Sequence, residues 1–327
     1  MNFRSTLWAA AIVMASAPSI WAADAIEPLV IEDAPARSDS AFSIYTAIGL
    51  VKIESNEIVY LGAGSDSVLS RLIWQSTAPM LTAGFDVAMP KGWTLSGKAQ
   101  VGMSGDSYME DYDWIDAPWF QGYGADDWTD RSQHDDTNLD WYFNGSVALG
   151  YDVIKDDTAT LNVNAGFKYV DVQWAAKGGT YVYSDSGFRD DVGSFPDGEP
   201  GITFRQKFPA AFLGLDGEIK QDQWTFGGSL QAGLTFGASD IDNHWMRDLV
   251  FDDTLGSAPM VALEANAGYA LDEKTSLFVT GTYDKIFTGR GDTTATDTVT
   301  DDSDTELDVA GGDFGAASIS VGIKGSF

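Results

Sequence analysis

Long segments in which apolar and polar residues alternate constrain the fold of this chain more than any other feature. Alternation with a period of two places apolar side chains on one face of a β-strand and polar side chains on the other. The clearest apolar set is Trp224, Phe226, Leu230, Ala232, Leu234 and Phe236. Comparable segments begin at Leu139, Leu161 and Val261. We therefore expect an all-β protein.

The last segment indicates which kind of β-protein this is. Its apolar set is Ile319, Val321, Ile323 and Phe327, with polar or small residues between them. An amphipathic final strand that ends in phenylalanine resembles the assembly signal of bacterial outer-membrane barrels. A soluble sandwich also alternates, but a membrane barrel turns its apolar set outward to lipid and its polar set inward. We predict an antiparallel transmembrane β-barrel.

The connections between the segments alternate in length. Short turns fall at 90–92, 155–157, 220–223 and 272–274, and long acidic stretches fall at 106–137, 183–200, 239–257 and 290–312. Short periplasmic turns and longer external loops are typical of barrels. With a smaller external loop near 62–66, this pattern predicts ten strands that extend above the outer membrane. The Asp- and Thr-rich run 292–304 is predicted to be a mobile external loop.

The N-terminus has the pattern of a secretory signal. Arg4 precedes an apolar stretch at 7–15 that is too short to span a bilayer, and small residues follow. We assign residues 1–23 to a signal peptide with cleavage between 22 and 25, residues 24–40 to a lead-in, and residues 41–327 to the barrel domain.

Charge and composition exclude several partners. Cysteine is absent, so disulfides and thiolate metal sites are excluded. The chain carries 49 acidic and 19 basic residues, a formal net charge of −30. This charge repels the phosphates of nucleic acid and favours a cationic substrate. We predict no metal and no cofactor.

Two short acidic stretches are the candidate site. Asp111 and Asp113 follow the predicted third strand, and Asp242 and His244 follow the seventh, on opposite walls of a ten-stranded cylinder. His244 is one of only two histidines. A carboxylate beside an imidazole orients it and stabilises its protonated form, so the four residues together suit activation of a water molecule. They predict a hydrolase. Other Asp pairs in this acidic chain leave open a merely solvated or cation-binding loop.

These stretches and several others together resemble the omptins, outer-membrane proteases of Gram-negative bacteria. The matching segments are Asp111-Tyr-Asp-Trp-Ile-Asp116, Trp128-Thr-Asp-x-Ser-x-His-x-Asp-Thr137, Gly178-Gly-Thr-Tyr-Val-Tyr183, Gly187 to Pro196 and Asp240-x-Asp-x-His244. By this resemblance, residues 41–327 form a barrel protease domain with its site outside the cell. His244 would take a proton from water, Asp242 would orient the ring, and the other pair would hold the water, with no acyl-enzyme.

The resemblance also implies the substrate and a lipid partner. Glu57 and Asp240 match two acids that line a pocket for a basic side chain, so cleavage beside Arg or Lys of cationic peptides is expected. Omptins depend on lipopolysaccharide bound by basic residues on the outer wall. Here 167–174 contains no arginine, and Lys207 with Arg205 are the residues we assign to that contact.

Three alternatives remain at this point. Ser132 and His134, with Asp130 or Asp136, can be read as a serine-type triad or as auxiliary residues of the cleft. The same pair would serve a lipid hydrolase. A non-enzymatic barrel, an adhesin or a small porin, is the third, although ten strands leave little room for a pore and predict a packed lumen.

Overall fold

The computed structural model describes residues 42–327, so the predicted signal peptide and lead-in lie outside the described residues. The strands are β1 (Phe42–Tyr60), β2 (Val68–Ala88), β3 (Trp93–Gly102), β4 (Asp106–Asp113), β5 (Asp130–Lys155), β6 (Ala159–Lys177), β7 (Thr180–Tyr183), β8 (Asp191–Ser194), β9 (Pro200–Gln221), β10 (Trp224–Thr235), β11 (Ala238–His244), β12 (Leu249–Leu255), β13 (Pro259–Ala270), β14 (Thr275–Asp297) and β15 (Ser303–Ser326). Short 3₁₀ turns form η1 (Pro90–Gly92) and η2 (Trp245–Arg247).

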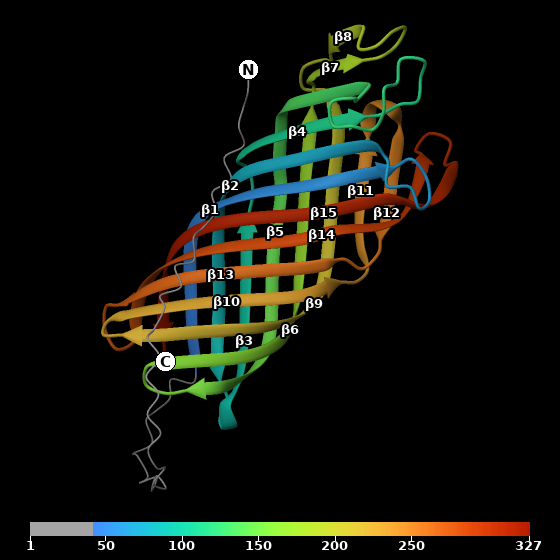
Figure 1. Ribbon diagram of the computed structural model, residues 1–327. Helices are drawn as coiled ribbons and strands as arrows, with labels where there is room; N and C mark the ends of the chain where they lie inside the picture. The colour runs from blue at the N-terminus through green and yellow to red at the C-terminus, as the bar shows by residue number, and fades with distance from the viewer. Residues whose placement is uncertain (1–41) are drawn as a thin grey trace, which may run out of the picture. The chain divides into compact units, whose positions relative to one another are not determined.

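These strands close into a ring of ten antiparallel barrel strands (Figure 1). Three barrel strands consist of two segments each: β3 and β4, β10 and β11, and β13 and β12. The order around the ring is β1, β2, β3/β4, β5, β6, β9, β10/β11, β13/β12, β14 and β15. β15 pairs with β1 from Ser326 opposite Ser43 to Ala310 opposite Val59, which completes the ring. The predicted ten-stranded barrel is confirmed.

Three barrel strands are interrupted, between β3 and β4, between β10 and β11 and between β12 and β13, and each interruption separates an inner segment from an outer one. Ser104 and Gly105, with φ of 58° and 121°, lie between β3 and β4, and Gly237, with φ of 58°, lies between β10 and β11. At Gly105 a Cβ would lie 2.4 Å from the carbonyl oxygen of Thr77, so glycine is required there. Two of the outer segments, β4 and β11, carry the candidate site.

An apolar band surrounds the half of the barrel nearest the short turns. On β10 the side chains of Trp224, Phe226, Leu230 and Leu234 are exposed. Exposed apolar residues continue around the ring, for example Ile48 on β1. This is the surface expected to face lipid. The outer ends of the strands, with all of β4, β11 and β12, lie beyond the band. Among residues 42–327 no helix is long and apolar enough to cross a membrane.

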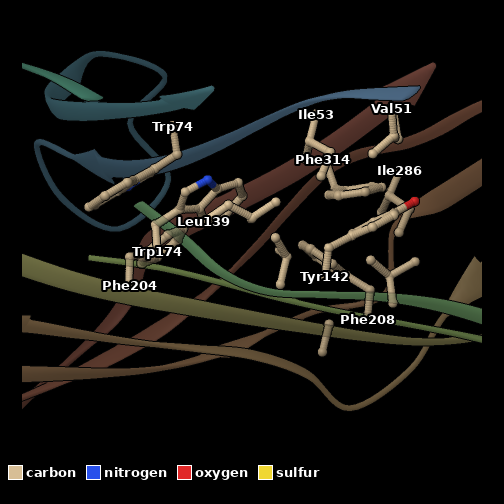
Figure 2. Close-up of a cluster of buried hydrophobic side chains, with 14 of the residues drawn as sticks. Val51, Ile53, Trp74, Leu139, Tyr142, Trp174, Phe204, Phe208, Ile286 and Phe314 are labelled. Carbon is tan, nitrogen blue, oxygen red and sulfur yellow. The ribbon is translucent and has the colours of Figure 1, made fainter. Parts of the chain in front are cut away.

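Buried aromatic side chains pack against one another in the interior of the barrel (Figure 2). Trp74 stacks on Phe204 and Trp174, with ring centroids 5.6 and 5.9 Å apart. Tyr142 stacks on Phe314 at 6.3 Å beside them. Because these rings come from five different barrel strands and are fully buried, they form a plug that supports the outer half of the barrel and argues against a porin.

Toward the short turns the lumen is less well packed than predicted. A polar cavity of about 670 Å³ remains there. Its walls carry the ion pair between Lys98 and Glu264, 2.7 Å apart, and the more deeply buried pair of Lys168 and Asp284. The charged side chains in this part of the lumen are paired with one another, and a polar cavity of this size can hold water molecules.

The short turns are confirmed, but the long external loops were predicted too wide. Much of 106–137 belongs to β4 and β5, and much of 239–257 belongs to β11 and β12. The predicted mobile run 292–304 is mostly strand, because β14 continues through Asp297 and β15 begins at Ser303. Asp297 Oδ1 accepts the backbone N–H groups of Val299 and Thr300, which closes a tight turn. Polar strands above the membrane lack the apolar alternation that marks the lipid-facing ones.

Candidate active site

The acid–histidine pair lies on the last residues of β11, within a strand and not in a loop as expected. Alternation directs Asp242 and His244 to the same inner face, while Ile241 between Asp240 and Asp242 points outward and is exposed. The His244 Nε2–H group donates to Asp242 Oδ2 across 2.6 Å, which leaves Nδ1 to accept a proton. Asp242 is fully buried and the His244 side chain is 12% exposed. The edge of the imidazole packs against Phe251, with centroids 5.3 Å apart, so the ring is held in place.

The second acidic pair ends β4. Asp111 lies opposite Ser132 of β5, and Asp113 lies opposite Asp130. Ser70 of β2 donates its hydroxyl to Asp111 Oδ1 across 3.3 Å. Burial, and after it the neighbouring charge of Asp113, raises the pKa of Asp111 well above its usual range. Burial raises the pKa of Asp113 to about 6, and the charge of Asp130 acts in the same direction. The pair therefore holds a proton more readily than free carboxylates do.

The two pairs face one another across the barrel mouth. The charge of Asp242 contributes to the raised pKa of Asp111, and the imidazole of His244 acts in the opposite direction on the pKa of Asp113. Arg247, on the turn that follows β11, also lowers the pKa of both carboxyl groups. The sequence did not predict Arg247 as a site residue, because Arg247 comes near Asp111 and Asp113 of β4 only when the strands close into a barrel. The structure thus brings the four predicted residues together.

Below the dyad lies an acidic pocket. Glu57 of β1 and Asp240 of β11 point into it as expected, and Asp253 of β12 joins them. One oxygen from each of the three carboxylates lies within 4.8 Å of the others. Burial raises the pKa of Asp253 to about 6, and it also raises the pKa values of Glu57 and Asp240 well above their usual range. Of the described residues that could hold a metal ion, these three form the cluster.

Asp253 was missed because the sequence pattern placed it in an irregular loop. In the structure it pairs directly with Asp240 across β11 and β12. Its neighbours Asp252 and Thr254 are more exposed while Asp253 is buried, the alternation of a strand with one inner face. The signal was present in the sequence, but only a recognised strand over 249–255 would have revealed it.

Comparison with known proteins agrees with this architecture. The family model described as the Omptin family matches residues 38–327. The chain belongs to the omptin family. A relative named Protease 7 from Escherichia coli strain K12 is 26% identical over 275 residues, which cover 81% of this chain and 84% of the relative. The plasminogen activator of Yersinia pestis is 26% identical over 277 residues, covering 82% and 84%.

The fold of this omptin is also similar to a solved structure. The crystal structure of the outer membrane protease OmpT from Escherichia coli superposes with a TM-score of 0.81 at 24% identity, and the match covers 90% of this chain and 99% of that one. This omptin is an outer-membrane β-barrel, and its candidate site lies beyond the lipid-facing band.

The serine-type triad is incomplete in this omptin. Ser132 Oγ lies 2.9 Å from His134 Nε2, as their spacing on one strand face requires. Among the described residues neither Asp130 nor Asp136 binds His134 Nδ1, which has no side-chain partner, and Asp130 accepts the backbone N–H of Ser184 instead. The buried His134 ring stacks on Phe195, with centroids 5.5 Å apart, and burial lowers its pKa. His134 therefore packs the β7–β8 hairpin against β5.

The predicted lipid contact lies on the outer wall of the omptin barrel. Arg205 and Lys207 share the outward face of β9 with the exposed Leu213 of the apolar band. The Arg205 guanidinium binds both oxygens of Asp171, with Nε–Oδ1 and Nη2–Oδ2 distances of 2.8 and 2.6 Å. Asp171 is also the cross-strand neighbour of Lys207. A carboxylate thus holds Arg205 at the edge of the band.

Proposed function

We propose that this omptin is an outer-membrane endopeptidase that cleaves peptide bonds beside basic residues. One observation carries the proposal: the buried Asp242–His244 pair faces Asp111 and Asp113 across an open mouth. Relatives named as a protease and a plasminogen activator, which the chain matches over most of its length, support the same activity.

In the proposed mechanism a water molecule is the nucleophile. His244 Nδ1 takes a proton from that water, and Asp242 stabilises the imidazolium that forms. Asp111 and Asp113 hold the water by accepting its other proton in a hydrogen bond. The water oxygen attacks the peptide carbonyl, and the tetrahedral intermediate collapses when the departing nitrogen takes the proton from His244. No covalent enzyme intermediate forms.

The charge of the site favours a basic substrate. Glu57 and Asp240 lie in a pocket next to the dyad, where their mutual repulsion would be relieved by a cationic side chain. The net charge of −30 attracts cationic peptides toward the cleft. The acidic pocket thus supports Arg or Lys beside the cleaved bond.

We also propose that lipopolysaccharide is required for activity. Arg205 and Lys207 are the residues assigned to its anionic groups, at the outer edge of the apolar band. Lysine supplies charge without the forked geometry of arginine, and the fork of Arg205 is already bound to Asp171, so the two residues would contribute mainly positive charge.

The test is cleavage of defined peptides by refolded protein, with and without lipopolysaccharide. Peptides with Arg-Arg or Lys-Lys should be cut at the basic residue, and a peptide without basic residues should stay intact. His244→Ala should abolish cleavage, whereas a substitution of the exposed Asp252 to Asn should not. Binding of basic peptides without any cleavage would instead support the adhesin interpretation.

A further inference from the structure

The acidic pocket contains three carboxylates arranged as a triangle, and their role in recognising a substrate rests on the proposed protease function. Glu57, Asp240 and Asp253 come from β1, β11 and β12 and are only 3%, 1% and 2% exposed. Each has one buried oxygen without a hydrogen-bond partner: Glu57 Oε2, Asp240 Oδ1 and Asp253 Oδ1. Buried carboxylate oxygens without donors are unfavourable, so the triangle is suited to a ligand that brings its own donors.

On one side of the triangle the backbone of a neighbouring strand passes close to the carboxylates, and the residue there is a glycine. Gly312 of β15 lies opposite Glu57 in the β1–β15 register. A Cβ at Gly312 would lie 2.7 Å from Gln206 Nε2 and 3.3 Å from Asp240 Oδ2. The same Cβ would lie 2.8 Å from Leu255 Cδ1, so any larger residue would clash, and glycine allows β15 to pass this close to Asp240.

The separation of the three carboxylate oxygens favours one of the two basic side chains, lysine, over the other, arginine. An ammonium group has three N–H donors in a tetrahedral arrangement. Acceptors at N–O distances of about 2.8 Å then lie about 4.6 Å from one another. The three carboxylate oxygens all lie within 4.8 Å of one another, so one ammonium group can reach all three. The donors of a guanidinium diverge in one plane, so it pairs with one or two carboxylates and leaves the third without a partner.

We infer that the triangle of Glu57, Asp240 and Asp253 is a lysine-selective pocket, and that Asp253 is the residue that favours lysine over arginine. A divalent cation suits it less well. Calcium takes six to eight oxygen ligands, whereas Gln206 presents its amide nitrogen here, 3.5 Å from Asp240 Oδ2 and donating to the Asn56 carbonyl.

The test uses three peptides identical except for Lys, Arg or Gln at the residue before the cleaved bond. Cleavage and equilibrium binding are both measured, binding in the His244→Ala variant. We expect the Lys peptide to exceed the Arg peptide by about tenfold or more in kcat/KM and in affinity, because arginine leaves one buried carboxylate without a donor.

Asp253→Asn should lower kcat/KM for the Lys peptide by about ten- to hundredfold and should change that for the Arg peptide much less. Asp252→Asn removes the same charge from the exposed face of β12 and should leave the Lys-to-Arg ratio unchanged.

Preference for the Arg peptide in the wild type, or a Lys-to-Arg ratio unaffected by Asp253→Asn, would overturn the inference. If the Lys peptide binds with the expected selectivity but the wild-type protein does not cleave it, the proposed protease activity is refuted, whereas the lysine-selective pocket is supported. Calcium chloride is titrated as a second probe. Calcium binding that disappears in Asp253→Asn, with no selectivity for lysine, would identify a metal site instead.

Discussion

The hydrogen bond between His244 and Asp242 allows a quantitative prediction. Asp242→Asn keeps the size of the side chain and an oxygen that can accept the Nε2–H, but it removes the negative charge. With Nε2 and Oδ2 2.6 Å apart, the centres of the two charged groups lie about 4 Å apart. At an effective dielectric constant of about 20, that charge stabilises an imidazolium by about 4 kcal/mol. Loss of this energy from the transition state lowers kcat by about a thousandfold.

The assay is steady-state hydrolysis of a fluorogenic basic peptide by refolded protein in lipopolysaccharide-containing micelles. KM should change much less than kcat, because the lost charge stabilises the imidazolium that forms only in the transition state. Heat unfolding of the barrel should be compared first, so that a folding defect is not taken for a catalytic one. The control is Asp252→Asn, which removes an equal charge from an exposed position of β12. A fall in kcat of less than about tenfold would refute the assignment of Asp242 as the residue that stabilises the imidazolium.

Three further predictions concern stability and lipid dependence. Burial raises the pKa of Asp253 to about 6 from the ordinary value of 3.8, so the folded state binds this proton more tightly and loses stability as the pH rises from about 4 to about 6. Asp253→Asn should therefore raise the melting temperature at pH 7 and change it little at pH 4, as measured by calorimetry in micelles. Lys168→Met leaves the buried Asp284 without its cation and should lower the free energy of unfolding by about 3–5 kcal/mol in urea titrations; an unchanged midpoint would show that Asp284 is neutral in the barrel. Combined Arg205→Ala and Lys207→Ala should raise the lipopolysaccharide concentration needed for half-maximal cleavage, with the maximal rate retained.

The strands that face lipid were predicted well because their signal is local. In β10, apolar residues alternate with polar or small ones from Trp224 onward, and the short turn before it, 220–223, consists of Lys, Gln and Asp residues. The outer strands were predicted poorly. Residues 249–255 and 292–297 pair above the membrane, where neither face requires apolar residues, and their composition is close to that of a solvated loop.

The sequence by itself determined the class of the fold, the number of barrel strands and the placement of Asp111, Asp113, Asp242 and His244 at strand ends. Each of these follows from residues within a few positions of one another, since alternation is a property of neighbouring residues. Only the tertiary structure decided which distant residues share the site.

Asp253 shows the difference. It meets Glu57, almost two hundred residues away in the chain, because the ring closes between β15 and β1 and because β12 pairs with β11 in the register that places Asp253 opposite Asp240. A shift of that register by one residue would turn Asp253 to the outer face and leave two carboxylates in the pocket. Strand register depends on pairing across the whole barrel, so the sequence of β12 alone could not reveal the third carboxylate.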